Sequence, residues 1–472
     1  MARINDYDVI VVGGGGGGLA AALEASKAGA SVVVLEADTR LGGATSNSGG
    51  VFYACSTSIQ KAAGIDNDRP QDIYDYLMTL NQWKQRPDLI RYYAEQCGPT
   101  LEWLIELGAQ FSPKWLVRSG VDTVPRGHSC ERAGQGIADA LINAVGASGV
   151  ETVLDCRVES LIVEEGRVVG VRAQGTELYA ASVVVTTGGF GNSPEMIRKH
   201  YPSAWHEGWT WAVHRNNPFI LGDGITMGEQ IGASIVGHDT GLTLPTSGFW
   251  QALEPWLPPW IMVVNKEGER FMSELSPYTV CGYLIEQQTE RRAWAIFDDP
   301  TLIEASMDIR YLDPYNAGIN IPTWEEPTIR DQVEKGRVKV AQSLTELADI
   351  VGIDALTLEQ TVKVYNADCD LGEDTHFHKK APRLFHIRQA PFYAVEIRSA
   401  IIGNTSVGLD IDVQTRVLDR HKRPIDGLYA AGEVLGCFQG DRYGGGGLAV
   451  GNAIVFGREA GMRAAARAKA GA

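Results

Sequence analysis

Six consecutive glycines near the start of the chain restrict its fold more than any other feature. They occupy positions 13–18 and follow YDVIVV (7–12), a short apolar run rich in β-branched residues that is typical of a buried parallel strand. A pattern of small residues typical of a helix (19–30) comes next, followed by a second apolar run, SVVVLEA (31–37). A strand, a glycine turn, a helix and a second strand in this order predict a βαβ unit and an α/β fold.

Three of these glycines have the spacing of a dinucleotide-binding fingerprint. Gly13 allows the tight turn, Gly15 lets the backbone approach a pyrophosphate, and Gly18 lets the helix pack against the strand. The N-terminus of the helix offers N–H groups and a partial positive charge to the phosphates. Glu36 ends the second strand 21 residues after Gly15 (36 − 15), where a carboxylate accepts a hydrogen bond from a ribose hydroxyl. The pattern predicts a bound dinucleotide, either NAD or FAD.

The charge and the apolar runs exclude several other classes of protein. The formal net charge is −16 over 472 residues and no basic run occurs, which disfavours nucleic acid or an anionic membrane as a partner. No apolar run approaches the roughly 18 residues that a membrane span needs, and the first residues lack an apolar leader. We therefore expect no membrane span and a cytoplasmic location.

The cysteines and histidines do not have the spacing of a metal site. The seven cysteines are dispersed and never spaced Cys-x-x-Cys, which suits a reducing compartment with neither disulfides nor a zinc site. His376 and His378 form a close pair, which is more typical of a solvated loop than of a metal site. We expect no metal.

The length of the chain predicts two domains, because 472 residues exceed what one core usually holds. Helical patterns fill about 69–110 and 327–366, strands alternate over 151–174 around a turn at Gly166, and a strand pattern resumes at PFYAVEI (391–397). We expect residues 1–238 and 389–472 to form the dinucleotide-binding domain, and residues 239–388 to form an inserted α+β cap that holds the substrate.

Later motifs decide between NAD and FAD. They occur in the order LGGATSNSGG (41–50), TTGGF (186–190), GDG (222–224), NKEGERF (265–271) and AAGEV (430–434). With the fingerprint, this series resembles the flavoprotein subunits of the fumarate reductase and succinate dehydrogenase superfamily, which includes soluble fumarate reductases and 3-ketosteroid dehydrogenases. The resemblance runs nearly end to end, and it implies FAD and a Rossmann-type FAD-binding domain with an inserted cap.

The resemblance also implies which residues contact FAD. Glu36 is expected at the adenosine ribose, Val158 near the adenine and Glu433 at the ribityl chain. The last helix, which begins at Gly447 and Leu448, is expected to place its N-terminal dipole beside the flavin, where it favours the anionic reduced form. The full set, with Thr45 and Ser46 at the phosphates and Asp223 on the flavin side, is Gly13, Gly15, Gly18, Glu36, Gly43, Thr45, Ser46, Gly50, Val158, Gly188, Asp223, Glu433, Gly447 and Leu448.

Two features that the sequence lacks bear on how FAD is held and reduced. The histidine used by such flavoproteins for covalent attachment is missing from residues 44–47, which read ATSN, so the resemblance implies non-covalent FAD. No second G-x-G-x-x-G lies between a strand and a helix. We therefore expect electrons to be exchanged with an external acceptor or donor and not with NAD(P)H. The sequence leaves a homo-oligomer open.

Forming a C=C bond next to a carbonyl needs a hydride path to flavin N5, a group for the α-proton and donors for the enolate. In a first hypothesis the chain resembles 3-ketosteroid dehydrogenases, whose R-F-x-x-E-x-x-x-Y stretch matches Arg270 to Tyr278. Their Y-P-G-P-G loop matches Tyr443 to Gly447, with glycine in place of both prolines. The resemblance implies that Tyr278 takes the proton and that the Tyr443 hydroxyl and the Gly447 N–H hold the ketone oxygen. A free tyrosine has a pKa of about 10, so Tyr278 would need positive charge from Arg270 or Arg442.

In a second hypothesis the chain resembles soluble fumarate reductases. Arg270 would then donate the proton, and Arg442 would clamp a carboxylate through two parallel hydrogen bonds. The chain departs from that family at two histidines, where it reads Leu244–Thr246 and Gly403–Thr405. The lost donors weaken the case for a dicarboxylate.

A cyclic ketone that also carries an acid group accommodates Tyr278, Tyr443 and Arg442 together. We therefore expect an FAD-dependent dehydrogenase (desaturase) that introduces a C=C bond α,β to the carbonyl of a cyclic ketone. The ketone would be 3-ketosteroid-like or a small oxo-cycloalkane carboxylate. Reduction of an α,β-unsaturated carboxylate is the alternative, and a non-catalytic FAD-binding electron carrier is a third reading from a different class.

Structural roles remain open for several of these residues. Tyr278 could be a packing residue, and Arg442 could pair with Asp441 or Glu433. Arg126 and His128 resemble an R-x-H segment near the flavin of reductases, with a structural role weighed equally.

Overall fold

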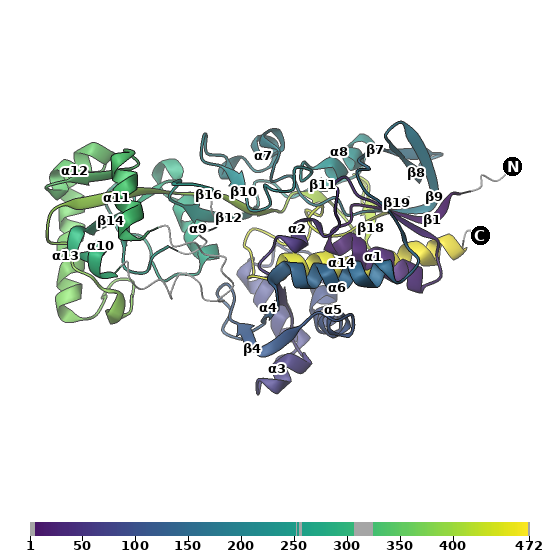
Figure 1. Cartoon of the computed structure of the whole chain (residues 1–472), viewed down its shortest axis with the longest axis horizontal. Helices are drawn as coiled ribbons and strands as arrows, with labels where there is room; N and C mark the ends of the chain where they lie inside the picture. Colours follow the sequence, from purple (N-terminus) through teal and green to yellow (C-terminus); the bar gives the residue numbers. More distant parts are fainter. Residues whose placement is uncertain (1–4, 252, 254–256, 306–323, 471–472) are drawn as a thin grey trace. The chain divides into compact units, whose positions relative to one another are not determined.

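The computed structural model describes residues 5–251, 253, 257–305 and 324–470. The chain forms two compact units. Unit 1 consists of Met1–Pro202, Ala212–Leu242 and Gly403–Ala472, and unit 2 consists of Ser203–Trp211 and Thr243–Ile402. Figure 1 shows the elements of both units in sequence colours. Among the described residues, no helix combines the length and the apolar character that crossing a membrane requires.

The predicted βαβ unit lies at the centre of the large sheet of unit 1. Strand β1 (Tyr7–Val12) pairs in parallel with β2 (Val32–Leu35) on one side and with β9 (Thr176–Val185) on the other. All four residues of β2 are buried, as parallel strands covered on both faces require. The sheet also contains β6 (Glu151–Val153), β19 (Pro424–Ala430) and β18 (Arg416–Leu418), in the order β18-β19-β9-β1-β2-β6. The carboxyl ends of β1, β2 and β9 therefore share one edge, where ligands of such sheets bind.

Two helices pack against each other through glycines at this sheet. They are α1 (Gly16–Lys27) and α14 (Leu448–Ala470), which lie side by side in Figure 1. A Cβ at Gly457 of α14 would lie 2.3 Å from the carbonyl oxygen of Gly17, and one at Gly461 would lie 2.1 Å from that of Ala21. The two backbones are therefore in direct contact, which explains the glycine and alanine content of α14.

The other elements of unit 1 surround this sheet. The polar stretch predicted as helical at about 69–110 forms α4 (Pro70–Leu80) and α5 (Pro87–Glu106), and Gly166 turns the hairpin of β7 and β8 as predicted. The remaining elements are α2 (Gly43–Ser46), β3 (Val51–Tyr53), α3 (Ser58–Ala62), β4 (Phe111–Val117), β5 (Gly127–Cys130), α6 (Ala133–Gly146), β7 (Val158–Glu164), β8 (Arg167–Ala173), α7 (Pro194–His200), α8 (Asp223–Gln230), β11 (Ile235–Val236) and β17 (Gly408–Leu409).

Unit 2 is built on a second, six-stranded sheet. Its longest strand, β16 (Phe392–Thr405), pairs antiparallel with β14 (Ala293–Asp298) and β15 (Val338–Ala341). The other strands are β10 (Trp211–Ala212), β12 (Gly241–Thr246) and β13 (Met262–Val264), and the helices are α9 (Tyr278–Glu286), α10 (Asp299–Ala305), α11 (Glu326–Glu334), α12 (Leu344–Val351) and α13 (Ala355–Leu371). The stretch predicted as helical at 327–366 thus also contains a strand, β15.

The C-terminal boundary of unit 2 differs from the sequence prediction. The return to the dinucleotide-binding domain was expected at residue 389, but β16 forms the middle of the second sheet, and unit 2 extends to Ile402. PFYAVEI is a run of apolar residues that suits the interior of either sheet. Its pairing partners, more than 50 residues away in the sequence, decide which sheet it joins.

Candidate active site

The glycines of the turn after β1 have two roles: two of them allow close packing, and one leaves room for a ligand. A Cβ at Gly18 would lie 1.9 Å from the carbonyl oxygen of Gly13, and one at Gly13 would lie 2.6 Å from that of Thr186. A Cβ at Gly15 would meet no atom within 4 Å. Gly13 and Gly18 are thus required for close packing, whereas Gly15 faces open space at the N-terminus of α1.

That open space belongs to a cavity at the carboxyl edge of the unit 1 sheet. Its empty volume, including the part open to solvent, is about 1080 Å³. Its lining includes nine of the predicted FAD contacts: Gly13, Gly15, Glu36, Gly43, Thr45, Val158, Gly188, Asp223 and Glu433. The other five lie outside the lining: Gly18, Ser46, Gly50, Gly447 and Leu448.

Glu36 accepts hydrogen bonds from the turn that it faces. Its carboxylate is bound by the N–H of Gly14 at 2.6 Å and by the N–H of Asp38 at 2.8 Å. Burial raises the pKa of Glu36, although these backbone hydrogen bonds act in the opposite direction. A carboxylate held in this way at the end of β2 suits a ribose hydroxyl.

Residues that the sequence motifs did not mark complete the cavity. Arg157 binds both carboxylate oxygens of Asp223 at 2.8 Å, so the predicted flavin-side carboxylate is already paired. The buried atoms His214 Nδ1 and Asn404 Oδ1 line the cavity and lack a hydrogen-bond partner among the described residues. Burial lowers the pKa of His214 to about 4. A bound dinucleotide, rich in hydroxyl and amide groups, would supply partners for both atoms.

The predicted ketone-binding residues lie on a glycine-rich loop directly before α14. The Tyr443 hydroxyl accepts a hydrogen bond of 3.2 Å from the N–H of Ala449, in the first turn of α14. Gly447 has φ +100°, and a Cβ there would lie 2.8 Å from the backbone nitrogen of Tyr53 on β3. Among the described residues, no acceptor takes up the N–H of Gly447. One hydroxyl and one free N–H therefore lie at the positive end of a helix.

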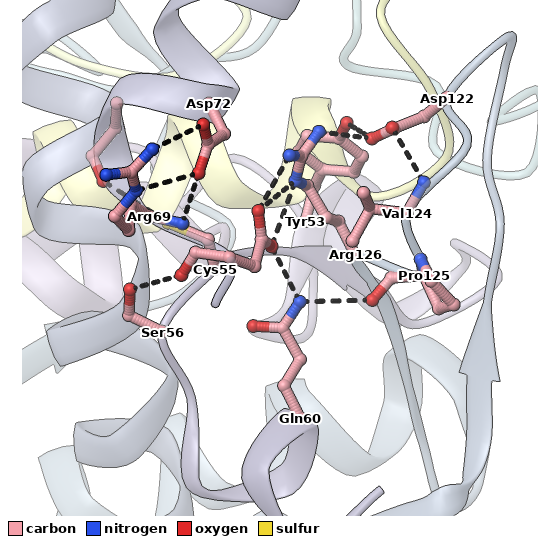
Figure 2. A network of polar contacts seen from close by, with 12 residues as sticks. Tyr53, Cys55, Ser56, Gln60, Arg69, Asp72, Asp122, Val124, Pro125 and Arg126 are labelled. Atoms are coloured by element: carbon pink, nitrogen blue, oxygen red, sulfur yellow. Dashed lines mark hydrogen bonds and ion pairs between the residues drawn. The ribbon is translucent and has the colours of Figure 1, made fainter. Parts of the chain in front are cut away.

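Arg126 and His128 belong to a buried network next to this loop. Arg126 binds Asp68 and Asp122 at shortest distances of 2.7 and 2.8 Å. Figure 2 shows Arg126 beside Asp122. The Tyr53 hydroxyl also donates to Asp122. The imidazole of His128 bonds the carbonyl of Arg126 and the hydroxyl of Thr57, both at 2.8 Å. In this network the guanidinium of Arg126 binds only protein carboxylates. This favours a structural role for Arg126.

Arg270 of unit 2 is paired with two carboxylates. It binds Glu274 through two hydrogen bonds of 2.9 and 2.8 Å and Asp374 through one of 2.7 Å, and its side chain is only 6% exposed. The buried ammonium group of Lys379 lies 3.3 Å from Glu274 and completes the cluster. Burial alone would lower the pKa of Arg270, but the two carboxylates outweigh it and raise the pKa above its usual value.

Tyr278 is half-buried and is the first residue of α9. The residue before it, Pro277, takes the N-cap position. The positive end of the α9 dipole therefore lies at the same end of the helix as Tyr278, which favours negative charge there.

His376 lies near more carboxylate side chains than its sequence context suggested. Asp368, Asp374 and His376 place their ligand atoms within 4.8 Å of one another. However, Asp374 already accepts hydrogen bonds from Arg270 and from the backbone of Phe377 and Lys379. Its lone pairs are used within the protein.

Comparisons with known proteins agree with the cavity chemistry. Residues 8–448 match the family model described as FAD binding domain. A probable fumarate reductase of Shewanella frigidimarina (strain NCIMB 400) is 34% identical over 459 residues, which cover 94% of this chain and 72% of that protein. The NADH:acrylate oxidoreductase of Vibrio harveyi is 32% identical over 402 residues, which cover 80% of this chain but 37% of that protein.

A solved structure extends the similarity to steroid enzymes. The 3-ketosteroid-Δ4-(5α)-dehydrogenase from Rhodococcus jostii RHA1, in complex with 4-androstene-3,17-dione, is 28% identical, with a TM-score of 0.78 and coverage of 98% of both chains. The family match and these relatives establish that the cofactor is FAD. They also establish that the protein is a flavoprotein oxidoreductase that acts on carbon–carbon bonds.

Because Gly15 and Gly18 have different surroundings, an added methyl group at Gly15 should impair FAD binding alone, whereas one at Gly18 should also destabilise the fold. Gly15 has φ −74° and ψ −177°, which alanine adopts freely, so Gly15→Ala should fold normally. Its methyl group would project toward the pyrophosphate, so FAD should bind about tenfold more weakly or worse. Gly18→Ala should lower the free energy of unfolding as well as the FAD content. Urea unfolding and the flavin absorbance of purified protein measure the two quantities. Full FAD affinity in Gly15→Ala would contradict this position for the pyrophosphate.

Because the His128 imidazole is buried, we expect the protein to lose stability in mild acid. Burial lowers the pKa of His128 from its ordinary 6.5 to about 4. Between these values the unfolded chain takes up a proton that the folded chain does not, so the free energy of unfolding falls as the pH drops from 6.5 to 4. The contribution of this residue is up to about 3 kcal/mol. His128→Gln should weaken the pH dependence in urea unfolding, whereas His421→Gln, at an exposed position, should not. An unchanged pH dependence in His128→Gln would refute the assignment.

Proposed function

This chain belongs to the FAD binding domain family, and we propose that it is a dehydrogenase that introduces a C=C bond α,β to the carbonyl of a cyclic ketone. The ketone is 3-ketosteroid-like or a small oxo-cycloalkane carboxylate. The observation that carries the proposal is the pair of groups before α14, the Tyr443 hydroxyl and the N–H of Gly447 that no described acceptor uses. Two donors at the positive end of a helix suit an oxygen that gains negative charge during the reaction.

Each catalytic group has one task in this scheme. When bound, FAD supplies the acceptor for the β-hydride. Tyr278 takes the α-proton, and its place at the start of α9 favours the anionic form that a base requires. Tyr443 and Gly447 hold the carbonyl oxygen and stabilise the enolate. Arg442 lies next to Tyr443 and contacts the acid group where the substrate has one.

Arg270 has a structural role in this proposal. Its guanidinium is bound by Glu274 and Asp374, and its raised pKa makes it a poor proton donor. The cluster instead fixes the segment that leads from Arg270 to Tyr278. This reading departs from the second sequence hypothesis, in which Arg270 donated the proton.

FAD binding and electron exchange follow from the same residues. Because no histidine occurs in residues 44–47, we infer that FAD is held non-covalently. The chain spans 37% of the length of the NADH:acrylate oxidoreductase that it resembles. Because no second G-x-G-x-x-G lies between a strand and a helix, we infer that its electrons are exchanged with an external acceptor or donor.

Reduction of an α,β-unsaturated carboxylate is the second candidate. It is supported by two relatives, a probable fumarate reductase and an NADH:acrylate oxidoreductase, and by Arg442 as a carboxylate ligand. The absence of histidine from Leu244–Thr246 and Gly403–Thr405 argues against fumarate itself.

An anaerobic substrate screen distinguishes the two candidates. We expect saturated cyclic ketones, 3-ketosteroids or oxo-cyclohexane carboxylates among them, to bleach the flavin of the purified protein and to lose two hydrogens. Stopped-flow absorbance and product mass measure both events. Failure of every ketone to bleach the flavin, together with reoxidation of dithionite-reduced protein by unsaturated carboxylates, would replace the first candidate by the second.

Replacing either catalytic tyrosine should lower kcat, and the expected size of the effect differs between the two. Tyr278→Phe removes the base and should lower kcat by about 10² to 10⁴-fold, as loss of a general base does. Tyr443→Phe removes one of two oxygen donors and should lower kcat by about 10² to 10³-fold. Both variants should retain FAD. Tyr283→Phe, on the same helix as Tyr278, is the matched control and should keep normal turnover. Normal turnover in Tyr278→Phe would remove this residue from the mechanism.

A further inference from the structure

The loop that carries Tyr443 has little rigidity of its own. Residues 438–447, here called the glycine loop, read FQGDRYGGGG and end in four consecutive glycines. Glycine has the largest backbone freedom of any residue. Donors that must meet a substrate oxygen within a few tenths of an ångström therefore need support from outside the loop.

That support comes from α4 and the turn that follows it. Three side chains there bind main-chain atoms of the glycine loop, and we call Tyr76, Asn81 and Gln85 the clamp residues. Gln85 donates to the carbonyls of Phe438 and Gln439 at 2.8 and 2.9 Å. The clamp residues are spaced five and four residues apart, so α4 and its turn present them along one stretch of the loop.

Asn81 holds the residue directly before Tyr443 at both of its backbone groups. Its side-chain oxygen accepts from the N–H of Arg442 at 2.7 Å, and its amide nitrogen donates to the carbonyl of Arg442 at 3.2 Å. The side chain is buried and also bonds the carbonyl of Leu77 within its own helix, so it has little freedom to move. A Cβ at Gly440 would lie 2.6 Å from the Asn81 oxygen, which shows how closely the loop packs on it.

Tyr76 holds the residue directly after Tyr443. Its hydroxyl donates to the carbonyl of Gly444 at 2.6 Å. A second segment packs against the same carbonyl, because a Cβ at Gly120 would lie 2.6 Å from it. The nearby residue Asp122 is fixed by Arg126 and Tyr53, as Figure 2 shows. The buried network thus supports the segment that lies against the loop.

We propose that Asn81 and Tyr76 are positioning residues, which set the orientation of Tyr443 and Gly447 by fixing the backbone on both sides of Tyr443. The inference rests on the proposed function, since it takes Tyr443 and Gly447 as the groups that hold the carbonyl oxygen. In this scheme neither Asn81 nor Tyr76 exchanges a proton or touches the reacting atoms. Their effect is on the alignment of the two donors.

The test measures donor alignment apart from turnover. 4-Nitrophenol is titrated into the oxidised, FAD-loaded protein, and its difference absorbance reports the fraction bound as phenolate, an anion that resembles an enolate. The wild-type protein should bind phenolate in preference to phenol. Asn81→Ala should bind phenolate about tenfold more weakly, and its kcat on a ketone substrate should fall by about 10- to 100-fold with KM little changed. Its FAD content should equal that of the wild type.

Companion variants keep the test decisive. Asn81→Asp keeps the acceptor for the Arg442 N–H but cannot donate to the Arg442 carbonyl, so its phenolate affinity should lie between wild type and Asn81→Ala. Tyr76→Phe, which loses a single hydrogen bond, should fold and should also bind phenolate more weakly. Gln71→Ala and Tyr74→Phe, on α4 with side-chain contacts to Asp75 and to Arg91 and Trp83, are the matched controls.

The outcomes separate this inference from the proposed function. Wild-type phenolate affinity and turnover in both Asn81→Ala and Tyr76→Phe would overturn the positioning role and leave the proposed function standing. A wild-type protein without preference for phenolate would overturn the oxygen-binding role of Tyr443 and Gly447, and the positioning role with it. Weaker phenolate binding in the clamp variants alone, with unchanged controls, supports both.

Discussion

The backbone contact between α1 and α14 governs how the cofactor cavity is built. Gly17, Gly457 and Gly461 let the first helix and the last helix approach until a single methyl group would overlap a carbonyl oxygen. As a result the glycine turn after β1 and the start of α14 lie at one edge of the sheet, where both contribute to the cavity lining. The same contact anchors the glycine loop, because that loop leads directly into α14. Cofactor binding and the proposed binding of the substrate carbonyl thus depend on one helix pair.

Buried ion pairs in this protein stabilise segments near the proposed catalytic groups, and their charged side chains have no part in the proposed proton transfer. Arg126 lies between two aspartates in unit 1, and Arg270 lies between Glu274 and Asp374 in unit 2. Both arginines are almost fully buried, and removing one partner from such a pair leaves an uncompensated charge. Apart from Arg442, the groups assigned to the reaction are tyrosine hydroxyls and a backbone N–H.

The sequence predicted what depends on short-range patterns. The strand, the glycine turn and Glu36 all lie within 30 residues, and their chemistry identifies a dinucleotide site without knowledge of the remaining chain. What it missed depends on partners far away. Asn81 and Arg442 are 361 residues apart, Arg270 and Asp374 are 104 apart, and no motif links either pair. His214 and Asn404 also carry no local signature, since an isolated polar residue is usually a surface residue. The apolar pattern of β16 fits either sheet, so the sequence alone did not indicate that unit 2 extends to Ile402.

The position of α14 also sets an order of events during synthesis of the protein. Val12 and Gly13 of the FAD cavity are made before unit 2, whereas Ala449, Val450 and Ala453 of the same cavity are made only after all of unit 2. Domains generally fold as they emerge from the ribosome, but this cavity cannot close until the ribosome has passed residue 453. The nascent chain therefore carries an incomplete nucleotide site while all of unit 2 is synthesised, and the complete cavity for FAD exists only after residue 453 has been made.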